Sequence, residues 1–240
     1  MEFKECLDKY ANIVNKELLK YTTLEEVPEK DLDKAVNYAL ISNAKRLRPI
    51  LILATYNLFR EDNEKCFPYM VAIEMIHNFS LIHDDLPGID NDDFRHGKPT
   101  LHKIYNESTA ILTGDRLLNY AYIVLINNLA IDDRDRDIKI RAIKELTNAT
   151  DRMIIGEYID TEYEGKPISN DYLEYMHRNK TGALLKAAVR IGAILAECPE
   201  EDLGRLTRYA ESIGLAFQIK DDILSEIGTE EELGKPVGND

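Results

Sequence analysis

Residues 73–93, IEMIHNFSLIHDDLPGIDNDD, join an apolar helical run to a dense cluster of carboxylates. Five aspartates occupy the ten positions from Asp84 to Asp93. Two unit charges about 4 Å apart repel by roughly 4 kcal/mol at the effective dielectric near a protein surface. A bound cation is the simplest way to offset that repulsion, so the stretch predicts a helix that ends at a metal site.

The same helical periodicity dominates the rest of the chain. Strand-like alternation is nearly absent, no Asn-Gly or Asp-Gly hairpin turn occurs, and the breaks RHGKPT, EGKPIS and CPEED are short. We therefore predict an all-α protein of about ten helices in one domain over residues 1–240. The predicted helices cover about 2–21, 31–43, 49–60, 64–86, 107–130, 136–160, 170–180, 181–195 and 200–228.

Composition excludes several classes of protein. The net charge of −14 argues against binding to nucleic acid or to an anionic membrane surface. The longest apolar stretch, residues 120–131, is too short to span a bilayer. The three cysteines are scattered without metal-site spacing, which favours a reducing, cytoplasmic location.

A second acidic pair, Asp221 and Asp222, also follows an apolar helical run. Carboxylates without cysteine suit a hard ion such as Mg²⁺ or Mn²⁺. Pro87 and Gly88 interrupt the helix that precedes the first acidic cluster, and this break would let Asp84 and Asp90 converge on one ion. The alternative is that both acidic clusters are simply solvated helix ends.

Basic residues accompany both clusters, as a metal–carboxylate site for an anionic ligand requires. Lys45 and Arg48 would project from one face of a helix, and His77 precedes Asp84 by two turns. Singly these residues would be ordinary surface charges, but together they describe two anion sites. Further candidates are Arg95, Lys98, Lys180 and Lys235.

One other acidic run fails as a site. Residues 133–137, DRDRD, begin like a calcium-binding loop, but Ile138 stands where the glycine belongs and Lys144 where the closing glutamate belongs. No nucleophile elbow, Walker motif or dinucleotide motif occurs.

These stretches resemble the trans-isoprenyl diphosphate synthase family, and within it the bacterial farnesyl diphosphate synthases most. Residues 73–93 are similar to its first aspartate-rich motif, and FQIKDDIL (217–224) with LGKPVG (233–238) to its second. Further signatures match in order: AKRLRP (44–49), HGKPT (96–100), GDRLLNYA (114–121) and HRNKTGALL (177–185). The resemblance implies about ten helices around a central cavity, and a homodimer.

The resemblance also implies roles for the acidic residues. Asp84 and Asp90 would bind two Mg²⁺ ions with support from Asp85, and Asp221 would bind a third; Mn²⁺ is an alternative metal. The ions would bridge the diphosphate of an allylic substrate.

The implied roles of the other residues concern two diphosphate substrates. The allylic diphosphate would contact Arg95, Lys180 and Lys235, with Thr181 and Gln218 near its reactive carbon. Isopentenyl diphosphate would contact Lys45, Arg48, His77 and His96. In the implied reaction the allylic C–O bond ionises, the isopentenyl double bond attacks the cation, and pyrophosphate takes the released proton.

The chain departs from the family pattern at several positions. His96 replaces the second arginine of an Arg-Arg pair, so that contact to isopentenyl diphosphate becomes sensitive to pH. Glu157 replaces a glutamine in GEYID. Relatives are expected to continue past Asp240 through further helices. The other departures are Asn43 and Ala44 in place of Gly-Gly, and Ser225, followed by Glu226, in place of an aspartate.

Product length is expected to depend on Phe79, five residues before Asp84, with Ser80 beside it and Ile76 nearly a turn deeper. In the family an aromatic residue there resembles the pattern that stops the chain at C15, so we expect farnesyl diphosphate. The alternatives are a C20 geranylgeranyl diphosphate synthase and a non-catalytic regulatory subunit, the latter motivated by His96, Glu157 and Ser225. A terpene cyclase is disfavoured, since it needs no second diphosphate site.

Overall fold

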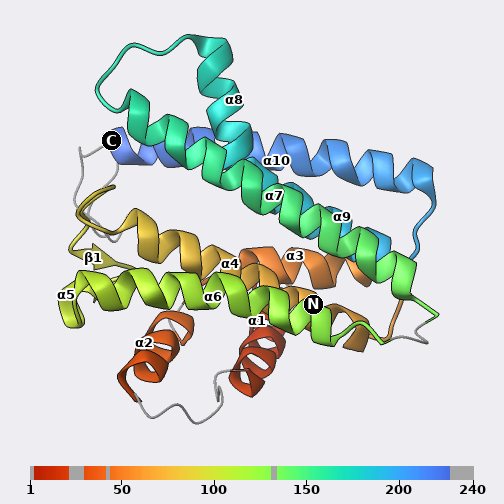
Figure 1. Cartoon of the computed structure of the whole chain (residues 1–240). Coiled ribbons are helices and arrows are strands. Elements are labelled where there is room, and N and C mark those ends of the chain that lie inside the picture. The colour runs from red at the N-terminus through yellow and green to blue at the C-terminus, as the bar shows by residue number, and fades with distance from the viewer. Residues whose placement is uncertain (1–2, 22–29, 42–43, 131–133, 228–240) are drawn as a thin grey trace. The chain divides into compact units, whose positions relative to one another are not determined.

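The fold is all-α, as the periodicity predicts. The structure is a computed structural model that describes the backbone of residues 3–21, 30–41, 44–130 and 134–227, without the side chains of 30, 221, 222 and 224–227. The described residues form ten α-helices, one 3₁₀ helix and one small hairpin (Figure 1). The elements are α1 (Phe3–Lys20), α2 (Lys30–Leu40), α3 (Leu47–Tyr56), η1 (Glu64–Cys66), α4 (Phe67–Asp84), β1 (Phe94–Arg95), β2 (Lys98–Pro99), α5 (Leu101–Ile104), α6 (Glu107–Asn127), α7 (Arg136–Tyr163), α8 (Asn170–Lys180), α9 (Gly182–Leu195) and α10 (Glu200–Ile227).

The elements divide into two compact groups, each described by itself. The first group comprises residues 1–50 and 67–129 and is built on α4 and α6, which run side by side (Figure 1). Helices α1 and α2 both contact α4. Residues 69–76 of α4 are fully buried on every side. A helix that is apolar all round has to be enclosed by other elements, which is why α4 is the core of this group.

The carboxyl end of α4 is held closely against α6. A side chain at Gly114 of α6 would collide with the ring of His83, so glycine is what allows the two helices to approach here. The His83 Nε2 atom lies 3.1 Å from the carbonyl oxygen of Ile111. The position of Asp84, the next residue, is therefore set by a helix–helix contact.

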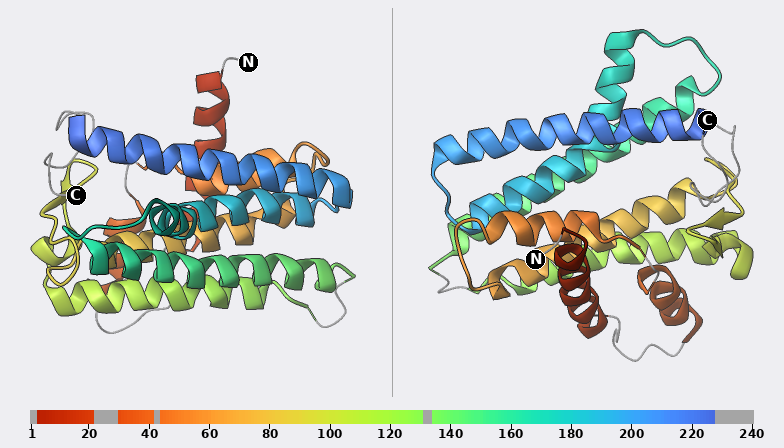
Figure 2. Two further views of the ribbon diagram at one scale, coloured as in Figure 1. Left: turned by 90° about the horizontal axis from the view of Figure 1, so that it is seen from above. Right: turned by 180° about the vertical axis from the view of Figure 1, so that it is seen from behind.

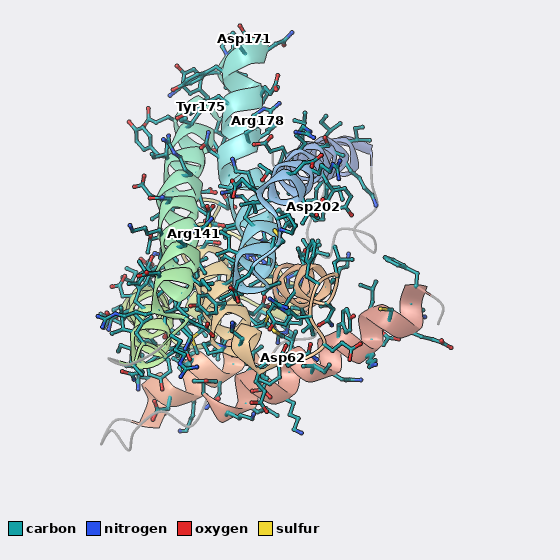
Figure 3. All side chains as sticks on the ribbon, turned by 90° about the vertical axis from the view of Figure 1, so that its right-hand side faces the viewer. Asp62, Arg141, Asp171, Tyr175, Arg178 and Asp202 are labelled. Atoms are coloured by element: carbon teal, nitrogen blue, oxygen red, sulfur yellow. The ribbon has the colours of Figure 1, made fainter. Side chains whose placement is uncertain are left out.

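The second group comprises residues 51–66 and 130–227, and its core is α9. Twelve of the fourteen residues of α9 are buried, and α7 and α10 pack against it (Figure 2). Arg190 of α9 makes a bidentate ion pair with Glu145 of α7, with Nε and Nη2 donating over 2.8 and 2.7 Å. Helix α8 packs on α7 near one end and projects outward, with Asp171 at its outer end (Figure 3).

The predicted helix boundaries agree with the structure to within a few residues, but the hairpin at residues 94–99 was not predicted. Phe94 pairs with Pro99 and Arg95 with Lys98, so the loop is the two residues His96 and Gly97. Both have positive φ, 53° and 73°, as the tight turn that joins two antiparallel strands requires. The turn does not use the Asn-Gly or Asp-Gly pair that marks most such hairpins, because histidine, like asparagine, tolerates this backbone region.

Two further expectations concern the whole chain. No helix in the described ranges is long and apolar enough to cross a membrane, as predicted for residues 120–131. The single domain over 1–240 stays a prediction.

Gly192 gives a test of the packing in the second group. A methyl group there would collide with the carbonyl oxygen of Ile52 and lie 3.1 Å from the amide nitrogen of Tyr56. Since backbone cannot move aside cheaply, Gly192→Ala should lower the free energy of unfolding by about 1–3 kcal/mol, measured by urea denaturation. Gly204 of α10 has nothing within 4 Å of such a methyl group, so Gly204→Ala should instead stabilise the protein by about 0.5–1 kcal/mol. Equal effects at the two glycines would contradict this packing.

Candidate functional site

The acidic loop, residues 84–93, folds back against the end of α4. The helix ends at Asp84, and the amide of Asp90 donates to the carbonyl oxygen of Asp84 over 2.9 Å. Asn91, with φ of 53°, then donates its amide to the carbonyl of Leu86. The predicted break at Pro87–Gly88 is confirmed, and it brings the backbones of Asp84 and Asp90 together.

Asp85 is engaged by protein rather than presented to solvent. Its carboxylate is buried and accepts a 2.5 Å hydrogen bond from Arg95 Nε, while Arg95 Nη2 lies 3.5 Å from Asp92. Burial raises the pKa of Asp85 to about 6, against the opposing effect of Arg95, and Asp92 and Asp90 raise it further. Arg95 therefore fastens the hairpin to the acidic loop, which fits the supporting role expected for Asp85.

A basic cluster lies beside this loop in the same group of elements. Arg48 Nη1 lies 3.0 Å from His77 Nε2. The pKa of His77 is well below its ordinary value, first because of burial and then because Arg48, Arg95 and His96 are close. At neutral pH the ring is therefore neutral, and its Nε2 accepts the proton that Arg48 donates.

His96 and Lys45 belong to the same cluster. The pKa of His96 is lowered by burial and by the nearby charges of Arg95, Lys45 and Arg46. The four residues predicted to bind isopentenyl diphosphate are thus linked by electrostatic neighbours: Lys45 acts on His96, and both His96 and Arg48 act on His77. The cluster is a concentration of positive charge and hydrogen-bond donors suited to an anion.

One premise about the basic residues was wrong. Lys45 and Arg48 were expected to share a helical face, but α3 begins at Leu47 and Lys45 precedes it in extended or irregular backbone. Between them, Arg46 has φ of 52° and is buried. The turn at Arg46, rather than helical spacing, therefore sets the directions of Lys45 and Arg48.

Arg46 is the residue that the sequence analysis missed. Its guanidinium contacts Glu74 over 2.6 Å, Asn15 Oδ1 over 3.0 Å and the carbonyl of Leu40. A signal was available in Glu74, a lone charge in an apolar helical run, because buried charges in proteins are almost always paired.

Lys180 lies in the second group of elements, at the end of α8. Its Nζ pairs with Asp160 and, over 3.1 Å, with Glu157, both on α7. The next residue, Thr181, hydrogen-bonds through its hydroxyl to Gln218 of α10. Lys180, Thr181 and Gln218 were all predicted site residues, while Asp160 was missed.

Three glycines bring α7 and α10 close to the junction of α8 and α9. A side chain on Gly156 would collide with the backbone of Lys180, and one on Gly214 would come within 2.9 Å of Gly182 Cα. The close neighbour of Gly182 is therefore Gly214. The glycines hold Lys180 beside the two carboxylates of α7.

The residues expected to set product length lie on the last turns of α4. Phe79 is nearly buried, and its ring meets that of His83 edge to face, with centroids 4.9 Å apart. Ile76 is fully buried, and the Ser80 hydroxyl donates to the carbonyl of His77. Phe79 is thus one turn before the acidic loop and deeper in the group.

The fit of the acidic residues to a metal can be judged from their chemistry. Within the described ranges, no group of three or more His, Cys, Asp or Glu side chains is arranged to hold a metal ion. Asp84 is partly exposed and Asp90 is exposed, so both carboxylates are accessible. Mg²⁺ is commonly held by one or two carboxylates, with substrate phosphates and water completing its shell, and these residues fit that pattern.

Some predicted residues are not described by the structure. Asp221 lies on α10, but its side chain is outside the described part, as is that of Ser225. Lys235 and Asn43 lie outside it altogether. Asp135, from the rejected calcium-like run, pairs with Lys65 over 2.8 Å, which agrees with a structural role.

Comparisons with known proteins identify the family of the chain. A family model described as polyprenyl synthetase matches residues 29–240. The chain is 42% identical to a farnesyl diphosphate synthase of Geobacillus stearothermophilus over 100% of this chain and 81% of the relative. It is 44% identical to a geranylgeranyl diphosphate synthase of Cyanophora paradoxa over 94% of this chain and 76% of the relative.

A solved structure is similar as well. It is a geranyltransferase from Helicobacter pylori complexed with magnesium and isoprenyl diphosphate, with a TM-score of 0.87 and 31% identity. The match covers 96% of this chain and 78% of that one.

The low pKa of His77 predicts how stability depends on pH. Because the folded state disfavours protonation of His77, the unfolded state binds more protons below the ordinary pKa of 6.5. Stability is therefore retained above pH 6.5 and falls as the pH drops below it, by at most about 1.4 kcal/mol per pH unit for this one group. Thermal unfolding between pH 8 and 5 measures the effect.

His77→Asn is the comparison, because His96 and His102, whose pKa values are also lowered, contribute to the same trend. The variant should show a shallower decrease of melting temperature with falling pH. An unchanged slope would contradict a neutral His77.

Proposed function

Since this chain belongs to the polyprenyl synthetase family and is a short-chain trans-prenyltransferase, we propose that it makes farnesyl diphosphate from isopentenyl diphosphate and dimethylallyl or geranyl diphosphate. The observation that carries the proposal is the adjacency of the acidic loop and the basic cluster, both of which involve Arg95. One anionic substrate held through metal would account for the acidic loop, and a second one held directly by cations would account for the basic cluster.

The allylic diphosphate would be bound at the acidic residues. Asp84 and Asp90 would hold Mg²⁺, with Asp221 for a third ion, and the metal would neutralise charge on the departing pyrophosphate. The similar Helicobacter pylori geranyltransferase is complexed with magnesium and isoprenyl diphosphate, which supports this use of metal. Arg95, Lys180 and Lys235 would add positive charge.

Isopentenyl diphosphate would be bound by Lys45, Arg48, His77 and His96. A neutral His77 ring that accepts from Arg48 fixes the guanidinium in one orientation, and a preorganised cation costs little reorganisation during reaction.

The reaction needs no nucleophilic side chain. The allylic C–O bond breaks with its electron pair leaving on pyrophosphate, and the isopentenyl double bond attacks the allylic cation to form a C–C bond. A proton then leaves the new cation and is accepted by pyrophosphate. Thr181 and Gln218 would lie near the reactive carbon, and exclusion of water from an apolar cavity would protect the cation.

We also infer that the protein is a homodimer in the cytoplasm. Exposed aliphatic side chains occupy one side of α6, where a soluble helix normally carries polar residues. They are Ile111, Leu112, Ile123 and Ile126. A second copy that covers this face would bury them, and the three free cysteines support a reducing compartment.

Isopentenyl incorporation is the direct test of the reaction. Radiolabelled isopentenyl diphosphate with dimethylallyl or geranyl diphosphate and Mg²⁺ should give a C15 product. EDTA should abolish turnover, and Asp84→Asn should lower it at least about 100-fold, because a carboxylate that holds the metal is lost. A folded protein that incorporates no label with either primer would refute the proposal.

Phe79→Ala tests the proposed product length. Removing the ring should open space one turn below the acidic loop, so the product should shift from C15 to C20 or longer, as read by chromatography of the dephosphorylated alcohols. Phe67→Ala, at the opposite end of α4, is the matched control and should leave C15 as the product. Unchanged length in Phe79→Ala would reject Phe79 as the chain stop, and C20 from the unmodified protein would favour a geranylgeranyl diphosphate synthase.

A further inference from the structure

Arg46 has the positive charge of a substrate-binding residue but not the exposed position of one. It stands between Lys45 and Arg48 in the sequence, yet its side chain is only 2% exposed and its ion-pair partner Glu74 is 0% exposed. Its guanidinium is occupied by acceptors from three elements: Asn15 of α1, Leu40 of α2 and Glu74 of α4. A diphosphate cannot reach it.

The backbone at Arg46 is strained. A φ of 52° is unfavourable for a residue with a side chain, by about 1–2 kcal/mol. The buried contacts of the guanidinium hold the residue in this conformation. The Arg46 carbonyl also accepts the first hydrogen bond of α3, from the amide of Ile50 over 3.1 Å. The direction in which α3 leaves the turn therefore depends on Arg46.

Two parallel contacts join this turn to α4. Arg46 pairs with Glu74, and Arg48 meets His77 over 3.0 Å. Glu74 and His77 are three residues apart on one helix, so they share a face. The first contact is buried and the second is nearer to solvent, so the first fixes the segment on which the second depends.

We propose that Arg46 is a positioning residue for isopentenyl diphosphate: its buried ion pair with Glu74 holds residues 44–48 on α4 so that Lys45 and Arg48 converge with His77. The proposal rests on the proposed function for the identity of the ligand. It assigns the effect to one substrate, because the Arg46–Glu74 ion pair anchors the segment that carries Lys45 and Arg48.

The test must separate positioning from stability. Removing Arg46 alone would leave Glu74 buried and unpaired, and one of its oxygens, Oε2, already has no hydrogen-bond partner among the described residues. Replacing both members of a buried ion pair with apolar residues of similar volume is often neutral or stabilising. The double variant Arg46→Met/Glu74→Met should therefore fold but lose the fixed turn.

The expected result is a change in one Michaelis constant. The double variant should raise the KM for isopentenyl diphosphate about tenfold or more, since small displacements at a binding site have large effects, and leave the KM for geranyl diphosphate within about twofold. Arg46→Lys, which keeps the charge without the planar fork, should shift the same constant in the same direction and serves as the test if the double variant does not fold.

The matched control is another ion pair of the same group. Arg116 of α6 pairs with Asp33 of α2 over 3.0 Å, and Arg116→Met/Asp33→Met should leave both KM values unchanged. A folded Arg46 variant with the isopentenyl KM of the unmodified protein would overturn the proposal, as would an equal rise in both constants.

Failure of the proposed function would look different. In that case the unmodified protein would incorporate no isopentenyl units at all. Calorimetric titration with inorganic pyrophosphate in EDTA would then test Arg46 alone: weaker binding by a folded Arg46 variant supports the positioning role, and equal binding rejects it.

Discussion

The burial of α4 is the constraint on which the first group of elements depends. A helix enclosed on every side from residue 69 to 76 can carry a polar group only if that group is paired. Glu74 is paired with Arg46, and His77 is neutral and contacts Arg48. The same helix therefore packs the core and organises the basic residues, and both pairings draw residues 46–48 onto it.

At its carboxyl end, α4 leads into negatively charged side chains, and these too are paired with a residue from another element. The carboxylates of the acidic loop begin where the helix leaves the core, and Arg95 reaches from the hairpin to Asp85 and Asp92. Arg95 also contributes to the lowered pKa of His77. One guanidinium thus lies between the acidic loop and the basic cluster, and it partly offsets the mutual repulsion of the aspartates without a metal ion.

Much of the fold and part of the site could be predicted from sequence, for identifiable reasons. Helical periodicity located the long helices, because burial of one face imposes the spacing directly. The turn at Arg46 and the hairpin at His96 were not predictable, since each depends on a positive φ that a non-glycine residue adopts only when tertiary contacts hold it there. The local sequence around Arg46 and around His96 does not by itself favour a positive φ.

Glu157 shows what a sequence departure means once its surroundings are known. The family resemblance would place a glutamine at this position; in the structure Glu157 is a second carboxylate beside Asp160 on the same lysine. Lys180 is held by Gly156 and the packing of α7 against α8, so it cannot move far to avoid either partner. An anion that binds at Lys180 must compete with two carboxylates already in place. The negative charge of Glu157 therefore weakens that binding unless a cation accompanies the anion, which links affinity at Lys180 to metal more tightly than a neutral glutamine would.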